Sequence, residues 1–245
     1  MNPVNPKLIL GGEMKRFFIT EAVFLMLLCF TGLTYASLVT TGTVLYDGEQ
    51  RNLIYDTDFN ITWLDYSREE DSWYNQMNWA DNLSLTVNGM TYDNWYLPET
   101  VDGDWEYGED GTTTAGFNIT TSDMGHLYYT ELGNIAYPGS PPDPDPTATL
   151  QRSGPFENLL SDAYWSMTTA AANSLSAWVF MFASGYQTRD PKDGLPTDMY
   201  PGGGHSAIAI MSGRIQVGSN VPVPTTAFLF GIGLLGFAGV ARRKT

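Results

Sequence analysis

Cysteine is nearly absent from this chain of 245 residues, and the single one, Cys29, lies in an apolar segment near the amino terminus. We expect that segment to be removed on export, which leaves a protein without cysteine. Such a protein can form no disulfide, offers no thiolate to a metal ion and has no cysteine nucleophile. The sequence therefore excludes disulfide scaffolds, zinc–thiolate sites and cysteine-dependent enzymes.

Basic residues are scarce as well, with 12 Lys and Arg against 27 Asp and Glu and a formal net charge of −15. Half of the basic residues lie in the two ends of the chain, together with only two acids, Glu13 and Glu21. The central region, residues 37–220, then holds 25 acidic and six basic residues, a net charge of −19. Because binding to nucleic acid requires Lys and Arg to neutralise phosphates, we expect no nucleic-acid partner, whereas cation binding is permitted.

Residues 1–36 are interpreted as an N-terminal extension followed by a signal peptide. We expect the true start at Met14, because Lys15 and Arg16 then form a positive segment ahead of an apolar run at residues 22–33. Thr34 and Ala36 supply small residues before a cleavage site that precedes residue 37. This order is typical of an exported protein.

The segment of residues 221–245 combines a proline-bearing motif, an apolar run and a basic end. The motif is Val221-Pro222-Val223-Pro224, the run of residues 225–241 carries no charge, and Arg242, Arg243 and Lys244 follow it. Seventeen residues of helix span roughly 25 Å, the short limit for crossing a bilayer, and the basic cluster has the sign of a cytoplasmic flank. The pattern predicts one transmembrane helix in a sorting tail. The alternatives to a sorting tail are an ordinary C-terminal membrane anchor and a buried core helix.

This order of motif, apolar segment and basic end resembles the PEP-CTERM sorting signal of Gram-negative bacteria. The usual Val-Pro-Glu-Pro of that signal stands here without its acidic residue, since Val223 occupies the position. The resemblance implies that an exosortase cuts or transfers the chain near Val221–Pro224, with Arg242 and Arg243 as part of the signal. It also implies export to the cell envelope, outer surface or extracellular matrix, after transient anchoring in the inner membrane through residues 225–241.

The central region is predicted to be one domain of short strands with one or two helices. Strands are expected at residues 38–46, 53–55, 61–64, 164–166, 177–182 and 206–211, where β-branched and aromatic residues gather between turn signals. Asp47-Gly48 is expected to end the first strand in a hairpin turn. Apolar residues at helical spacing predict a helix within residues 69–85, which Asn88-Gly89 is expected to end. Asp123 is expected to cap a second helix that reaches Leu132.

An ordered series of short blocks in this region carries a second resemblance. The blocks read YD at residues 55–56, NITWLD at 60–65, MNWAD at 77–81, DNWYLP at 93–98, ELGN at 131–134, GPFENL at 154–159, YWS at 164–166 and WVFMF at 178–182. The series is similar to the Lcl C-terminal family, in its version found on PEP-CTERM proteins, over roughly residues 55–214. The resemblance implies an α+β fold with a single C-type-lectin-like domain. A fold does not supply an activity, so function must be argued from a site.

An acidic loop offers the candidate metal ligands. Its five acids are Asp102, Asp104, Glu106, Glu109 and Asp110. Calcium takes several oxygen ligands from a short flexible loop, but the EF-hand pattern is not met, because Tyr107 stands at its glycine position and Thr113 at its final acid. Two interpretations stay open: an irregular calcium site, or a solvated acidic loop in a protein with no cofactor.

Catalytic groups are few. Gly204-His205-Ser206-Ala207-Ile208 resembles the nucleophile elbow of esterases but ends in Ile208 where that motif has glycine. Ser206 is the one nucleophile that a hydrolase hypothesis can name. Carboxylate pairs for glycoside hydrolysis can always be found among 25 acids, so their presence carries little weight.

Aromatic side chains could instead present flat apolar faces to sugars. The candidates are Trp73, Trp79, Trp95, Trp105, Tyr66, Tyr74, Tyr92 and Tyr107. Trp79 and Trp95 are expected in the core, and Trp105, in the acidic loop, is the candidate for exposure. We therefore expect a non-enzymatic surface or matrix protein with an adhesive, exopolysaccharide-associated or biofilm role. The alternatives are a calcium-dependent glycan-binding protein and a surface hydrolase that acts on matrix polysaccharide.

Overall fold

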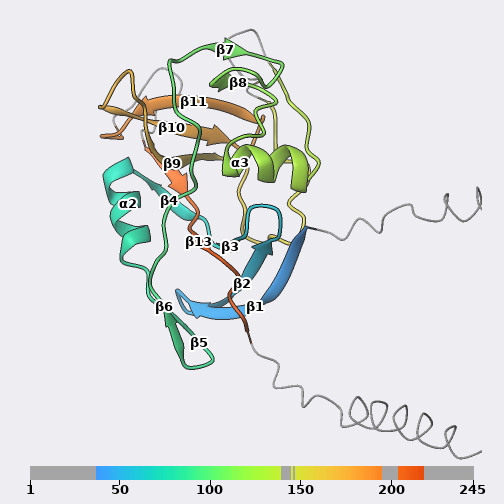
Figure 1. The fold of residues 1–245 in the computed structure, drawn as a ribbon, viewed down its shortest axis with the longest axis vertical. Coiled ribbons are helices and arrows are strands. Elements are labelled where there is room, and N and C mark those ends of the chain that lie inside the picture. The colour runs from blue at the N-terminus through green and yellow to red at the C-terminus, as the bar shows by residue number, and fades with distance from the viewer. Residues whose placement is uncertain (1–36, 139–144, 146, 195–203, 218–245) are drawn as a thin grey trace, which may run out of the picture. The chain divides into compact units, whose positions relative to one another are not determined.

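Strands dominate the computed structural model, which describes residues 37–138, 145, 147–194 and 204–217 (Figure 1). Helices account for only 11% of the described residues, so the expected α+β, C-type-lectin-like fold is wrong. The physical reason lies in the apolar runs, which are short and rich in β-branched and aromatic residues. Such runs pack well on pleated sheets and are too short for buried helices.

A four-stranded antiparallel sheet joins the start of the domain to its end. Its strands, in spatial order, are β1 (Leu38–Tyr46), β2 (Glu49–Asp56), β3 (Ile61–Leu64) and β13 (Ile210–Ser212). Asp47 and Gly48 connect β1 to β2 with φ angles of 51° and 76°. Two successive positive φ angles give a tight turn whose twist matches that of the strands, so the predicted hairpin is confirmed.

A second sheet of seven strands has the order β4-β12-β9-β10-β11-β8-β7. Its bounds are β4 (Arg68–Asp71), β7 (Tyr107–Gly108), β8 (Ala115–Gly116), β9 (Ala163–Thr169), β10 (Ser176–Met181), β11 (Tyr186–Pro191) and β12 (His205–Ala207). The pairs β12–β9 and β7–β8 are parallel, and the other pairs are antiparallel. Trp165 on β9 and Trp178 on β10 are fully buried. The centre of this sheet is therefore covered on both faces.

The helix predicted within residues 69–85 is shorter than expected. Helix α2 covers Trp73–Asp81, and the hydroxyl of Ser72 caps it by accepting from the amide of Asn75 at 3.3 Å. Residues on either side are strands, since β4 pairs with β12 before the helix and β5 (Leu85–Val87) pairs with β6 (Met90–Tyr92) after it. Asn88 and Gly89, expected to end a helix, instead make the β5–β6 turn at φ 52° and 79°.

The second predicted helix is confirmed in place but not in form. A single α turn, α3 (Asp123–Gly125), leads into a π-helix, η1 (His126–Glu131). The hydroxyl of Ser122 accepts from the amide of Gly125 at 3.1 Å and begins the segment.

Residues 206–211, predicted as one strand, divide between the two large sheets. The chain leaves β12 at Ala207 and enters β13 at Ile210. Ala207, Ile208 and Ala209 are fully buried, and each belongs to a different one of the three apolar clusters that form the core. This crossing therefore joins the separate parts of the core.

The predicted signal peptide, the transmembrane helix over residues 225–241 and the sorting residues Val221–Pro224, Arg242 and Arg243 lie outside the described residues. Within the residues that the structure describes, no helix is both long and apolar enough to cross a membrane.

Candidate functional site

A polar groove of about 630 Å³ runs along α2. It is lined by Tyr46, Arg68, Asp71, Asn75, Asn78, Trp79, Asn82, Leu83 and Ser84. These residues come from the end of β1, from β4 and from α2 with the segment that follows it. The volume is in the range that small-molecule sites occupy.

One face of α2 supplies three amides and an indole to the groove. Asn75, Asn78, Trp79 and Asn82 are spaced i, i+3, i+4 and i+7, and residues so spaced lie on the same side of a helix. The side-chain nitrogen of Asn82 donates to the backbone oxygen of Asn78 at 2.7 Å, which also closes the end of the helix. The groove therefore has a row of hydrogen-bonding groups beside an aromatic ring.

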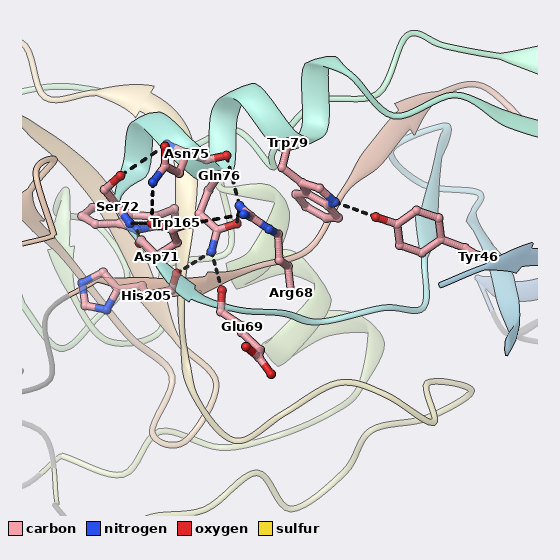
Figure 2. Close-up of polar contacts among 10 residues, drawn as sticks. All are labelled: Tyr46, Arg68, Glu69, Asp71, Ser72, Asn75, Gln76, Trp79, Trp165 and His205. Carbon is pink, nitrogen blue, oxygen red and sulfur yellow. Dashed lines mark hydrogen bonds and ion pairs between the residues drawn. The ribbon is translucent and has the colours of Figure 1, made fainter. Parts of the chain in front are cut away.

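Arg68 is held in place beside α2 by contacts with its neighbours (Figure 2). Its Nη1 donates to Oε1 of Gln76 at 2.7 Å, its Nη2 lies 3.2 Å from Oδ2 of Asp71, and its guanidinium lies 5.8 Å from the centre of the Trp79 ring. Gln76 is fully buried and donates to the backbone oxygens of Glu69 and His205 at 2.7 and 2.9 Å. The guanidinium is thus fixed from below by the core.

Aromatic rings fix the other end of the groove. The indole nitrogen of Trp79 donates to the hydroxyl of Tyr46 at 2.8 Å, as Figure 2 shows. The ring of Tyr66 packs against both of these rings. Its centre lies 4.9 Å from that of Tyr46, edge-on, and 6.1 Å from that of Trp79, with the planes tilted. Burial, and next the carboxylate of Asp47, raise the pKa of Tyr66, so the Tyr66 hydroxyl stays uncharged at neutral pH. Rigid rings of this kind lose little conformational entropy when a ligand packs on them.

The groove holds one carboxylate, and that carboxylate is already hydrogen-bonded. Asp71 is the single carboxylate among its nine lining residues. Its Oδ1 already accepts from the backbone amide of Ser72 at 2.8 Å and from the side chain of Asn75 at 2.7 Å, and its Oδ2 faces Arg68. Glycoside hydrolysis normally requires two carboxyl groups across the scissile bond, and the lining residues supply one.

The acidic loop, for which the sequence leaves open both a calcium site and a solvated loop, is exposed at all five acids. Asp102 accepts from the indole of Trp178 at 2.9 Å, and Glu109 accepts from the hydroxyl of Tyr107 at 2.7 Å. Asp104, Glu106 and Asp110 lie on the same loop. Among the described residues, no three of these five acids bring ligand atoms together, so the structure adds no support to calcium at this position. Trp105 is 37% exposed, as its loop position suggested.

Ser206 lies in strand β12 and is almost fully buried. Its hydroxyl donates to Oδ2 of Asp162 at 2.6 Å, while the ring of His205 lies 3.0 Å from Oδ2 of Asp190. Successive side chains of a strand point to opposite faces. His205 and Ser206 therefore point to opposite faces of the sheet. The Ser206 hydroxyl, which a hydrolase would need exposed on a strand-to-helix turn, is instead buried and bonded to a carboxylate.

Sequence reasoning named Trp79 as an aromatic candidate but placed it in the core, and it did not name the asparagines. The signal that could have found them is the spacing Asn75, Asn78, Asn82 around Trp79 on a predicted helix. Three amides on one face of a helix contribute nothing to a core. Their exposure points to the solvent or to a ligand.

Comparison with known families assigns the carboxy-terminal segment. The PEP-CTERM protein-sorting motif matches residues 220–244. The chain carries an exosortase sorting signal. This signal makes it an exported, surface-targeted protein that an exosortase processes. Searches among curated proteins and among solved structures found no match, and no match supports the resemblance of the central region to the Lcl C-terminal family.

Proposed function

We propose that the exported domain is a non-enzymatic glycan-binding module that attaches to polysaccharide of the cell surface or extracellular matrix and takes part in adhesion or biofilm formation. The groove along α2 carries this proposal. Sugar rings present hydroxyl groups at their edges and apolar C–H faces, and the groove offers amides and a fixed guanidinium next to an indole. Most of the lining residues carry polar side-chain groups, which suits a ligand that presents many hydroxyl groups.

Preorganisation strengthens the argument. Arg68 is bonded to buried Gln76, Asp71 is bonded to the start of α2, and Trp79 is bonded to Tyr46, so the groove is shaped before a ligand arrives. Groups that are already ordered lose little conformational entropy on binding. The net charge of the central region, −19, repels polyanions and so favours a neutral or basic polysaccharide.

The test is binding of the full-length chain, in mild detergent, to a glycan array and to purified neutral and acidic polysaccharides. The double variant Asn75→Ala, Asn78→Ala should bind at least about tenfold more weakly, because it removes two amides, each a loss of about 1 kcal/mol. Alanine favours helix, so α2 should persist. Asn94→Ala is the matched control, since Asn94 is an exposed asparagine outside the groove.

Three outcomes would contradict the proposal. The first is no binding to any polysaccharide at any ionic strength. The second is full binding by the double variant with an unchanged melting temperature. The third is release of reducing ends by the wild-type chain that is lost in Ser206→Ala, because that result would make the protein a hydrolase. Binding that disappears in chelator and returns with calcium would instead favour the calcium-dependent alternative.

A further inference from the structure

A buried cluster of one histidine and two acids lies away from the groove. Its members are His126 and Glu131, at the two ends of η1, and Asp56, the last residue of β2. Nε2 of His126 lies 2.9 Å from Oε1 of Glu131, and one potential ligand atom from each of the three residues lies within 4.8 Å of the others. Asp56 is fully buried, His126 is 8% exposed, and the side chain of Glu131 is 2% exposed.

The π-helical turn brings the histidine and the glutamate together. In an α-helix, residues five apart are rotated by about 140° and point in different directions. In η1 the backbone amide of Leu132 donates to the oxygen of Leu127, five residues earlier, at 2.9 Å. This wider turn allows His126 and Glu131 to meet. Single π turns inside α-helices are rare and are found frequently at functional sites.

Asp56 is oriented by its own turn, with one oxygen left over. Its Oδ1 accepts from the backbone amides of Asp58 at 2.9 Å and Phe59 at 3.1 Å. Its Oδ2 is buried and has no hydrogen-bond partner among the described residues. A buried acceptor without a partner costs free energy, and native structures rarely leave one unexplained. The orphaned oxygen belongs to the carboxylate that meets His126 and Glu131.

The cluster has too much negative charge for one imidazole to balance. Besides the two buried acids, Oδ2 of Asp58 lies 4.0 Å from Nε2 of His126, and Asp123 on α3 interacts electrostatically with Asp56. Burying carboxylates close together is costly unless a cation accompanies them. The ring of Phe59 stacks on His126 with centres 4.0 Å apart and planes 18° apart, which covers the imidazole on one side.

We propose that Asp56, His126 and Glu131 bind a divalent transition-metal ion, in the first place Zn²⁺. An imidazole with two carboxylates suits zinc. Calcium takes six to eight oxygen ligands, whereas one of the three ligands here is the imidazole nitrogen of His126. The fourth position is open to water or to Asp58. Asp56 ends β2, and His126 and Glu131 belong to η1, so the ion would link two segments that are distant in the sequence.

The experiment uses the full-length chain, without a polyhistidine tag, in mild detergent after treatment with chelator. Calorimetry with Zn²⁺ should show one bound equivalent, and Zn²⁺ should raise the melting temperature by several degrees. Glu131→Gln and His126→Gln, which keep size and polarity, should each weaken binding at least about tenfold. Glu109→Gln, an exposed acid of the acidic loop, is the matched control and should bind as the wild type does.

A second measurement uses the fact that the chain has two histidines. In a ¹⁵N-histidine-labelled sample, Zn²⁺ should shift the ring nitrogens of His126 and leave those of His205 in place. The signal missing in His126→Gln gives the assignment. Absence of any ring-nitrogen shift at saturating Zn²⁺ would overturn the proposal even if the variants did not fold, and so would a shift confined to His205. Equal binding by wild type and Glu131→Gln would overturn it as well.

Discussion

Asp65 is a fully buried carboxylate that holds a distant loop against the four-stranded sheet, and removing it should destabilise the domain strongly. Its Oδ1 accepts from the backbone amide of Asn158 at 2.9 Å, and its Oδ2 accepts from that of Glu157 at 3.0 Å. The side chains of Asn52 and Asn158 each donate to Oδ2 at 3.3 Å. One carboxylate thus satisfies four donors.

The size of the effect follows from these bonds. Asp65→Ala leaves two backbone amides without an acceptor, at about 1–3 kcal/mol each, and frees two side-chain amides that can turn elsewhere. Glu157 is exposed, so water satisfies part of this loss, and we expect a decrease of about 4 kcal/mol in the free energy of unfolding. Asp65→Asn keeps one oxygen but sets its NH₂ group against an amide of the loop. It should cost about 2 kcal/mol.

Urea denaturation of the full-length chain, followed by tryptophan fluorescence, measures both values from the midpoint and slope. Asp104→Ala, an exposed acid of the acidic loop, is the control and should change stability by less than about 0.5 kcal/mol. A loss below about 1 kcal/mol for Asp65→Ala would refute the reasoning, since it would mean that the loop amides are solvated. Equal losses for alanine and asparagine would refute the assignment of the effect to individual hydrogen bonds.

Two further predictions concern backbone space and pH. Gly116→Ala should lower the free energy of unfolding, measured by thermal melting, by about 3 kcal/mol or more, because the added Cβ would collide with the backbone oxygen of Gly108 and φ is 112°. Gly89→Ala is the control: its φ is 79° and no atom lies nearby, so the loss should be only about 1 kcal/mol. The carboxyl of Asp123 lies among three ionisable side chains, Glu99, Asp56 and His126. Burial, together with the charges of neighbouring acids, raises its pKa to about 6 from 3.8, so the folded state holds its proton more tightly than the unfolded state. The free energy of unfolding should therefore fall by up to about 3 kcal/mol as the pH rises from about 4 to above 6. Asp123→Asn, measured in chelator, should remove that fall. An unchanged pH profile in the variant would contradict the prediction.

Local features of the fold could be predicted from the sequence. The bounds of β1 and β3 agree with the expected strands, because β-branched and aromatic residues alternate there between turn signals. Asp47-Gly48 ends the first strand as predicted, since both residues tolerate positive φ. The short helix at residues 73–81 was found but overextended. These features depend on residues that are neighbours in the chain.

Features that depend on partners far away could not be predicted in the same way. Arg68–Asp71 is wholly polar and gives no strand signal, yet it is a strand because β12 supplies its hydrogen bonds. Residues 206–211 read as one apolar run, and only the positions of β9 and β3 decide where it divides. The α+β expectation failed because it rested on the ordered blocks, whereas the apolar runs are short and rich in β-branched and aromatic residues, which favours strands.

The candidate sites follow the same division. The helix face that lines the groove was present in the spacing of Asn75, Asn78 and Asn82. The histidine–carboxylate cluster could not be predicted from residue spacing, because a π turn has no sequence signature here and Asp56 lies far from His126 in the chain. The acidic loop drew attention through its composition, but composition does not say whether carboxylates converge.

The crossing from β12 to β13 makes completion of the core depend on the last part of the domain. The strands β1, β2 and β3 come first in the chain, but their sheet lacks its fourth strand until residues 210–212 are in place. Ile215, the last fully buried residue described, lies only a few positions before the sorting signal at residues 220–244. The core can therefore be completed only when nearly all of the chain that precedes the sorting signal is present. A cut within the signal leaves in place every strand that the structure describes.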